Sequence, residues 1–193
     1  MTKPFAVVDL DGVLADVTAR LHHIEGERKN WTAFFAGIPD DPPYAEGLAA
    51  ARQLATDHDL IYLSGRPERT RRDTEGWLRQ HNAPAGRLML RRNADRRPAR
   101  IVKIAQLRTL ADERPVAVFV DDDPAVCRAA QEAGFAGPAA PAQQHRHVAA
   151  AGERKAGNVD GIAITVFAHL GAALVVAGAA GIGGGNIDGD DLL

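Results

Sequence analysis

Residues 5–13 read FAVVDLDGV, an apolar run that ends in two aspartates and a glycine. Continuous apolar runs of this length are typical of strands buried on both faces of a parallel sheet. Asp9 and Asp11 are two residues apart, so in extended chain both carboxylates point to the same side. Gly12 allows the backbone to turn sharply where the strand ends. The stretch therefore predicts a buried strand with a pair of carboxylates at its carboxyl end.

The pattern that follows alternates strands with helices as far as about residue 137. Further apolar runs, LIYL at 60–63, LML at 88–90 and VAVFV at 116–120, are separated by helical stretches. This rhythm predicts an α/β fold with a Rossmann-like core, in which a parallel sheet carries helices on both faces. A small insert at about residues 16–44 follows the first strand. Ligands of such sheets bind beyond the carboxyl ends of the strands, so the polar residues there are the candidates for a site.

Composition sets further bounds on the chain. Its 193 residues suit one domain, or one domain with a tail. With 46% hydrophobic and 25% charged residues the chain is not wholly disordered, and its one cysteine excludes a disulfide framework and a cysteine-based zinc site. The N-terminus, MTKPFAVVD, carries no basic, apolar leader, so we expect a cytoplasmic protein. Residues 66–103 hold 12 basic and 4 acidic groups, which indicates either an anion-binding surface or a solvated helix face.

The last part of the chain, residues 138–193, is rich in Ala, Gly and Pro and predicts a tail beyond a domain at 1–137. Within it, residues 161–182 are apolar except for Thr165 and His169. Their length suits a membrane span, but half of them are Gly or Ala. A weak membrane anchor, a helix packed on the domain and a poorly ordered tail therefore all stay open, and membrane contact is not the favoured interpretation.

Two further polar groups are candidates for binding phosphate, one after the second strand and one in a later helix. Ser64, Gly65 and Arg66 come directly after LIYL. A hydroxyl, a backbone amide beside a glycine and a guanidinium can together hold phosphate oxygens. Lys103, in the first turns of the helix after a proline, can offset the charge of a phosphoryl group. Either group alone has an ordinary structural explanation, as a turn or as a surface lysine.

Asp121, Asp122 and Asp123 follow the VAVFV strand. Three adjacent carboxylates repel one another, so a bound cation is the natural explanation, and hard oxygen ligands suit Mg²⁺. Asp123 precedes a proline and is assigned as a helix N-cap. This leaves Asp121 and Asp122, together with Asp9 and Asp11, as candidate metal ligands.

The order of these groups, DxDG, then Ser, then Lys, then an acidic pair, resembles the haloacid dehalogenase (HAD) superfamily of phosphotransferases across about residues 5–137. The resemblance implies that Asp9 is a nucleophile that forms an aspartyl-phosphate and that Asp11 is the acid/base. It also implies that Ser64 and Lys103 hold the phosphoryl group and that the acidic pair binds Mg²⁺. Dehalogenases lack the second carboxylate of DxD, so its presence here favours phosphate-ester chemistry.

Three longer stretches, at 64–81, 88–103 and 120–134, resemble the phosphatase domain of polynucleotide kinase-phosphatases. This resemblance implies that Arg91, Asp95 and Arg97 help to hold a nucleic-acid 3′-phosphate end. The kinase half is not represented, because no GxxxxGK[ST] loop occurs in the sequence.

The expected function is a magnesium-dependent phosphomonoester hydrolase that acts on nucleic-acid 3′-phosphate ends in nucleic-acid repair. Two alternatives stay open: a phosphatase of free nucleotides or other small phosphoesters, and a non-catalytic module that binds nucleic acid through its arginines. No protein partner is inferred. Trp31, Phe34 and Phe35 in the insert form either a lid surface or a small satellite core, whereas Trp77 and Cys127 are expected in the core.

Overall fold

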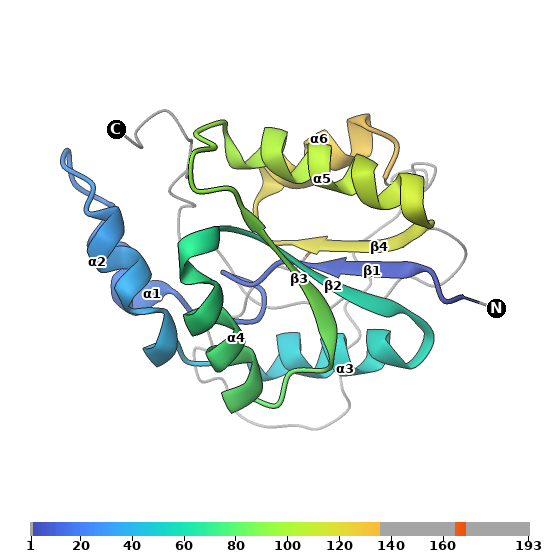
Figure 1. Ribbon diagram of the computed structural model, residues 1–193, viewed down its shortest axis with the longest axis horizontal. Helices are drawn as coiled ribbons and strands as arrows, with labels where there is room; N and C mark the ends of the chain where they lie inside the picture. The colour runs from blue at the N-terminus through green and yellow to red at the C-terminus, as the bar shows by residue number, and fades with distance from the viewer. Residues whose placement is uncertain (1, 136–164, 169–193) are drawn as a thin grey trace, which may run out of the picture.

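The computed structural model describes residues 2–135 and 165–168. In this part of the chain the strands form one sheet in the order β3-β2-β1-β4-β5 (Figure 1). The strands are β1 (Phe5–Val8), β2 (Asp59–Pro67), β3 (Gly86–Arg91), β4 (Val116–Asp121) and β5 (Thr165–Ala168). Strands β1 to β4 are parallel, which confirms the α/β prediction. Strand β5 pairs antiparallel with β4.

Helices cover both faces of the sheet, as predicted. They are α1 (Thr18–Leu21), α2 (Trp31–Ala36), α3 (Ala45–Asp57), α4 (Arg71–Gln80), α5 (Ala99–Glu113) and α6 (Pro124–Glu132), with short 3-10 helices η1 (Ile38–Asp40) and η2 (Glu68–Thr70). Alternate residues of β1 point to opposite faces: Ala6 and Val8 pack with α3 and α4, and Phe5 and Val7 pack with α5 and α6. Figure 1 shows the two helical layers on either side of the sheet.

Two core predictions are confirmed. Trp77 of α4 is 1% exposed and Cys127 of α6 is 4% exposed. The Trp77 indole donates a hydrogen bond from Nε1 to the carbonyl oxygen of Asp41 at 2.7 Å. This bond ties α4 to the end of the insert.

The insert forms a small lid, α1, α2 and η1, beyond the carboxyl ends of the strands (Figure 1). Ile24, Trp31 and Phe34 make a satellite core of their own, and Phe35 packs against it while half-buried. The aromatic residues of the insert were expected to form either a lid surface or a satellite core. Trp31 and Phe34 form a satellite core, and Phe35 lies at its margin.

The predicted apolar tail segment, 161–182, lies outside the described residues except for β5. Its residues 165–168 read TVFA, and β-branched and aromatic residues of this kind favour a strand. Within residues 2–135 and 165–168, none of the helices has the length and hydropathy needed to cross a membrane.

Candidate active site

The first and fourth strands bring two carboxylates to a shared lysine. Asp9 directly follows β1, and Asp121 is the last residue of β4, the strand beside it. Lys103 on α5 donates hydrogen bonds from Nζ to Oδ2 of Asp9 and to Oδ2 of Asp121, both at 2.7 Å. All three side chains are buried. Residues separated by up to 112 positions thus meet at the carboxyl edge of the sheet, as the strand-end argument predicts.

A cluster of three carboxylates lies at this point. Asp9, Asp121 and Asp122 each offer an oxygen, and these oxygens lie within 4.8 Å of one another. Lys103 offsets one of their three charges, which leaves two formal negative charges. In addition, Oδ1 of Asp9 is buried and has no hydrogen-bond partner among the described residues. Hard oxygen donors, an excess of two charges and an unpaired buried oxygen fit a divalent cation such as Mg²⁺.

The pKa values of these groups reflect the same crowding. Burial raises the pKa of Asp9 well above its usual value, against the opposing effect of Lys103. Desolvation beside the cluster and then the charge of Asp121 raise the pKa of Asp122 to about 7, although this residue keeps solvent exposure. The pKa of Lys103 is raised in turn, because Asp121 and Asp9 outweigh its own burial. A cation held by the carboxylates would favour their ionised forms.

Asp11 is placed differently from the expectation that it joins the other carboxylates as a metal ligand. Its side chain lies outside the cluster of three, and its Oδ1 accepts hydrogen bonds from Nε of Arg66 at 2.9 Å and from Nη2 of Arg20 at 2.8 Å. Burial acts to raise the pKa of Asp11, but Arg66 and then Arg20 outweigh it and hold that pKa below its usual value. The Asp11 carboxylate is therefore clamped by two guanidinium groups.

Asp41 completes this clamp. It is 4% exposed and accepts hydrogen bonds from Nε of Arg20 at 2.7 Å and from Nη2 of Arg66 at 3.2 Å. Two carboxylates and two guanidinium groups thus form a neutral network between the lid and β2. Sequence reasoning missed Arg20 and Asp41, because both lie in the insert and neither belongs to a spaced motif.

Gly12 has a steric role at the site. Its φ is +77°, in the region that favours glycine, and a Cβ at this position would lie 2.0 Å from Oδ2 of Asp122. A side chain at residue 12 would therefore displace the Asp122 carboxylate from the cluster.

The predicted phosphate-binding group lies at the end of β2. Ser64 is buried, and its Oγ accepts a hydrogen bond from the backbone amide of Arg66 at 3.2 Å. A Cβ on Gly65 would lie 3.8 Å from Nη2 of Arg91, which comes from the end of β3. Arg91 is 4% exposed, and its Nε has no hydrogen-bond partner in the described chain. A buried guanidinium with an unused donor therefore lies beside residues 64–66 of β2.

Asp95 and Arg97 lie close enough to Arg91 to interact with it electrostatically, but they pair with each other. They lie in the loop between β3 and α5, where Nη2 of Arg97 donates to Oδ2 of Asp95 at 2.6 Å. This hydrogen bond lowers the pKa of Asp95 to about 2. Arg97 is exposed, and the described contacts of the pair do not include Asp9 or Asp11. The loop thus presents a basic side chain to solvent rather than to the carboxylate cluster.

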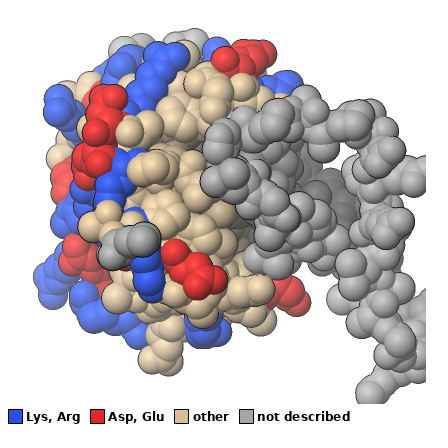
Figure 2. Space-filling model, turned by 90° about the vertical axis from the view of Figure 1, so that its right-hand side faces the viewer, with Lys and Arg blue, Asp and Glu red and all other residues tan. Residues whose placement is uncertain are grey.

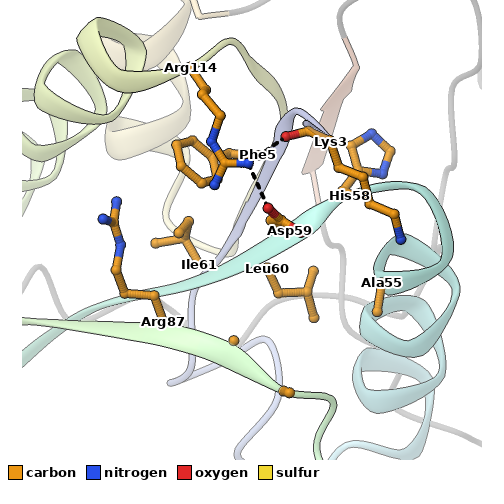
Figure 3. A pocket seen from close by; sticks show the side chains of 11 residues that line it. Lys3, Phe5, Ala55, His58, Asp59, Leu60, Ile61, Arg87 and Arg114 are labelled. Carbon is orange, nitrogen blue, oxygen red and sulfur yellow. Dashed lines mark hydrogen bonds and ion pairs between the residues drawn. The ribbon is translucent and has the colours of Figure 1, made fainter. Parts of the chain in front are cut away.

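Arg87, one of the basic residues at 66–103, does not lie at the carboxyl ends of the strands. Arg87 is the second residue of β3, so it lies at the opposite, amino-terminal edge of the sheet. Figure 2 looks onto that edge and shows acidic and basic side chains close together. A cavity of about 410 Å³ opens there, with Arg87 and Arg114 among its lining residues (Figure 3). Both arginines are paired, Arg87 with Glu113 and Arg114 with Asp59.

Comparison with known proteins identifies the family to which the chain belongs. The family model described as the polynucleotide kinase PNKP phosphatase domain matches residues 4–137. A search of curated proteins finds no match.

Two solved structures are similar in fold. One, titled the structure of the Pnkp1/Rnl/Hen1 RNA repair complex, has a TM-score of 0.52 and 23% identity. That match covers 68% of this chain and 40% of the other, so this chain spans less than half of that protein's length. The other is a class C acid phosphatase from Bacillus anthracis with tungstate bound, with a TM-score of 0.50 and 15% identity. That match covers 70% of this chain and 63% of the other.

The family match spans all four parallel strands and every residue of the carboxylate cluster. The chain therefore belongs to the family of polynucleotide kinase PNKP phosphatase domains, and it is a HAD-type phosphatase.

Proposed function

We propose that this phosphatase removes phosphate from nucleic-acid 3′ ends in a magnesium-dependent reaction that passes through an aspartyl-phosphate on Asp9. The observation that carries the proposal concerns Asp9 and Asp11. These carboxylates are two residues apart in the sequence, but their side chains lie in different environments. Asp9 faces Lys103 and the acidic cluster, and Asp11 faces two arginines. Paired acidic groups in different environments can take different roles in one reaction.

In the first half-reaction, an oxygen of Asp9 attacks phosphorus and the bond between phosphorus and the leaving oxygen breaks. Lys103 and the hydroxyl of Ser64, near the end of β2, stabilise the charge on the transferring group. The leaving oxygen takes a proton from Asp11. The two arginines disfavour the protonated form of Asp11, but a bound dianionic phosphate raises its pKa because like charges repel.

In the second half-reaction, Asp11 takes a proton from water, and the resulting hydroxide attacks the phosphorus of the aspartyl-phosphate. Inorganic phosphate leaves, and the Asp9 carboxylate is restored. The clamp formed by Arg20 and Arg66 keeps Asp11 ionised and therefore suited to this step.

We assign the metal to Asp9, Asp121 and Asp122. A divalent cation bound there would supply charge stabilisation for the phosphoryl oxygens. The chain's own contribution is to hold the three carboxylates in place, through Lys103 for Asp9 and Asp121 and through the space left by Gly12 for Asp122.

The nucleic-acid substrate is supported by the basic groups beside the site. Arg91 has an unused buried donor next to residues 64–66 of β2, and the loop that follows Arg91 carries exposed arginines at 92, 96 and 97. A polynucleotide offers further phosphates next to the terminal one, and exposed arginines favour such a substrate. The Pnkp1 protein in the similar structure belongs to an RNA repair complex, which agrees with an end-processing role.

Free nucleotides and small phosphoesters are the second candidate, because the clustered carboxylates act on phosphate itself. The two candidates separate in one assay: phosphate release, with Mg²⁺, from an oligonucleotide with a 3′-phosphate, the same oligonucleotide with a 5′-phosphate, and free 3′- and 5′-nucleotides. The proposal predicts strong preference for the 3′-phosphorylated oligonucleotide. Equal or faster turnover of free nucleotides would contradict the polynucleotide assignment. Asp9→Asn is the inactive control.

A further inference from the structure

A stack of flat side chains connects the lid to the turn after β2. Trp31 and Phe35 of α2 are stacked, with ring centroids 5.7 Å apart and an angle of 24° between their planes. The guanidinium carbon of Arg69 lies 5.5 Å from the centroid of the Phe35 ring. Burial falls along this series: Trp31 is buried, Phe35 is half-buried and Arg69 is exposed. The stack therefore ends at the surface in a guanidinium group.

The parts of the stack are held in place by their neighbours. Phe34 makes edge contacts to both Trp31 and Phe35, at 82° and 76°, which fixes the orientation of the Phe35 ring. The backbone amide of Arg69 donates to Oδ1 of Asn93 at 2.8 Å, which anchors the turn carrying Arg69 to the loop after β3.

Arg69 is not used by the fold in the way that other arginines near the site are used. Arg20 also lies over an aromatic ring, that of Phe34 at 4.1 Å, but it is buried and bonded to Asp11 and Asp41. Within residues 2–135 and 165–168, Arg69 forms no ion pair with a carboxylate. Its exposed face is free to receive a ligand.

The position of the stack is next to the candidate active site. Arg69 is three residues after Arg66, whose guanidinium contacts Asp11. Phe35 follows Phe34, whose carbonyl oxygen accepts a hydrogen bond from Arg20, the other arginine that contacts Asp11. Both supports of the stack are thus within three residues, along the chain, of residues that contact Arg20 or Asp11.

We propose that Arg69, seated on the ring of Phe35, is the platform on which the nucleobase of the phosphorylated nucleotide stacks. Planar guanidinium groups and aromatic rings are the side chains on which unpaired bases stack. This inference rests on the proposed function, since it gives the substrate a base next to its phosphate. It differs from phosphate recognition by Arg91, because stacking depends on the base and not on charge.

The test compares substrates with and without the base. One oligonucleotide carries a normal 3′-terminal nucleoside 3′-phosphate, and a second carries an abasic tetrahydrofuran residue with the same phosphate. For the wild-type protein, kcat/KM is expected to be roughly 10-fold higher with the base, within the range that alanine substitutions report for base stacking. Arg69→Lys keeps the charge and removes the plane, and Phe35→Leu keeps an apolar side chain and removes the ring. Both are expected to bring the ratio close to 1, because they lower kcat/KM for the substrate that carries the base.

Arg79→Lys is the matched control, since Arg79 is exposed at the far end of α4 and should keep the wild-type ratio. A wild-type ratio close to 1, or a ratio that Arg69→Lys leaves unchanged, would overturn the proposal. If free nucleotides prove to be the better substrates, the polynucleotide assignment fails, and the same variants are compared on a nucleoside monophosphate and the corresponding pentose phosphate. The affinities of the Asp9→Asn variant, alone and combined with Arg69→Lys, for the two oligonucleotides give the same contrast without turnover.

Discussion

Replacing Lys103 with methionine tests the electrostatic core of the site. In the metal-free protein this change removes the ammonium group that contacts Asp9 and Asp121, each at 2.7 Å, and leaves both carboxylates buried. Breaking a buried ion pair by removing one partner costs about 3–5 kcal/mol. We expect a loss of this size in the free energy of unfolding at pH 8.

The loss should depend on pH in a definite direction. The pKa values of Asp9 and Asp121 are raised by burial even with Lys103 in place. A carboxyl group with a raised folded-state pKa adds stability at low pH, and this contribution disappears as the pH rises through that pKa. In Lys103→Met both groups can take up protons at pH 5, so the variant should recover most of its lost stability there.

The assay is urea denaturation with EDTA present, at pH 5 and at pH 8. Lys3→Met provides the matched control, since Lys3 is exposed and its replacement should cost less than about 1 kcal/mol at either pH. A loss below about 1 kcal/mol for Lys103→Met at pH 8, or the same large loss at both pH values, would refute the reasoning.

Three further substitutions and one pH comparison can be measured on the same protein. Gly12→Ala places a methyl group on the Asp122 carboxylate at a positive φ, so Mg²⁺ affinity by calorimetry should fall at least about 10-fold; unchanged affinity would remove Asp122 from the metal site. Gly47→Ala would bring a Cβ within 2.0 Å of the Val13 carbonyl oxygen and should lower the free energy of unfolding by more than about 2 kcal/mol. Gly76 in α4 has open space around it, so Gly76→Ala should raise the free energy of unfolding by up to about 1 kcal/mol. Because the pKa of Asp122 is raised to about 7, protons compete with the cation below that pH, so the rise in melting temperature on adding Mg²⁺ should be larger at pH 8 than at pH 6; an equal rise at both values would contradict this linkage.

The carboxylates of the candidate site were predictable because strand ends converge. Asp9 and Asp121 follow apolar runs that could only be buried strands, and parallel strands bring their carboxyl ends to one edge of a sheet. Lys103 was predictable from its place in the order of motifs. In each of these cases a local pattern and a general rule of topology agree.

The arginine clamp on Asp11 was not predictable in the same way. Arg20 and Asp41 lie in the lid, where no strand or repeat fixes their position, and only tertiary packing brings them to Arg66. A count of basic residues over 66–103 also cannot distinguish the arginines near the site from those elsewhere on the sheet. The basic block contains Arg66 and Arg91, which are buried near the site, and Arg87, which lies at the other edge because it begins its strand instead of ending it.

The most direct test of the central claim is a burst experiment with Asp11→Asn and p-nitrophenyl phosphate, whose leaving group needs no proton. If Asp9 is the nucleophile and Asp11 activates the water, this variant should release about one p-nitrophenolate per protein molecule and then stall. Acid-quenched protein should carry phosphate on the peptide that contains Asp9. Steady release without a burst, or protein with no bound phosphate on that peptide, would contradict the proposed covalent mechanism.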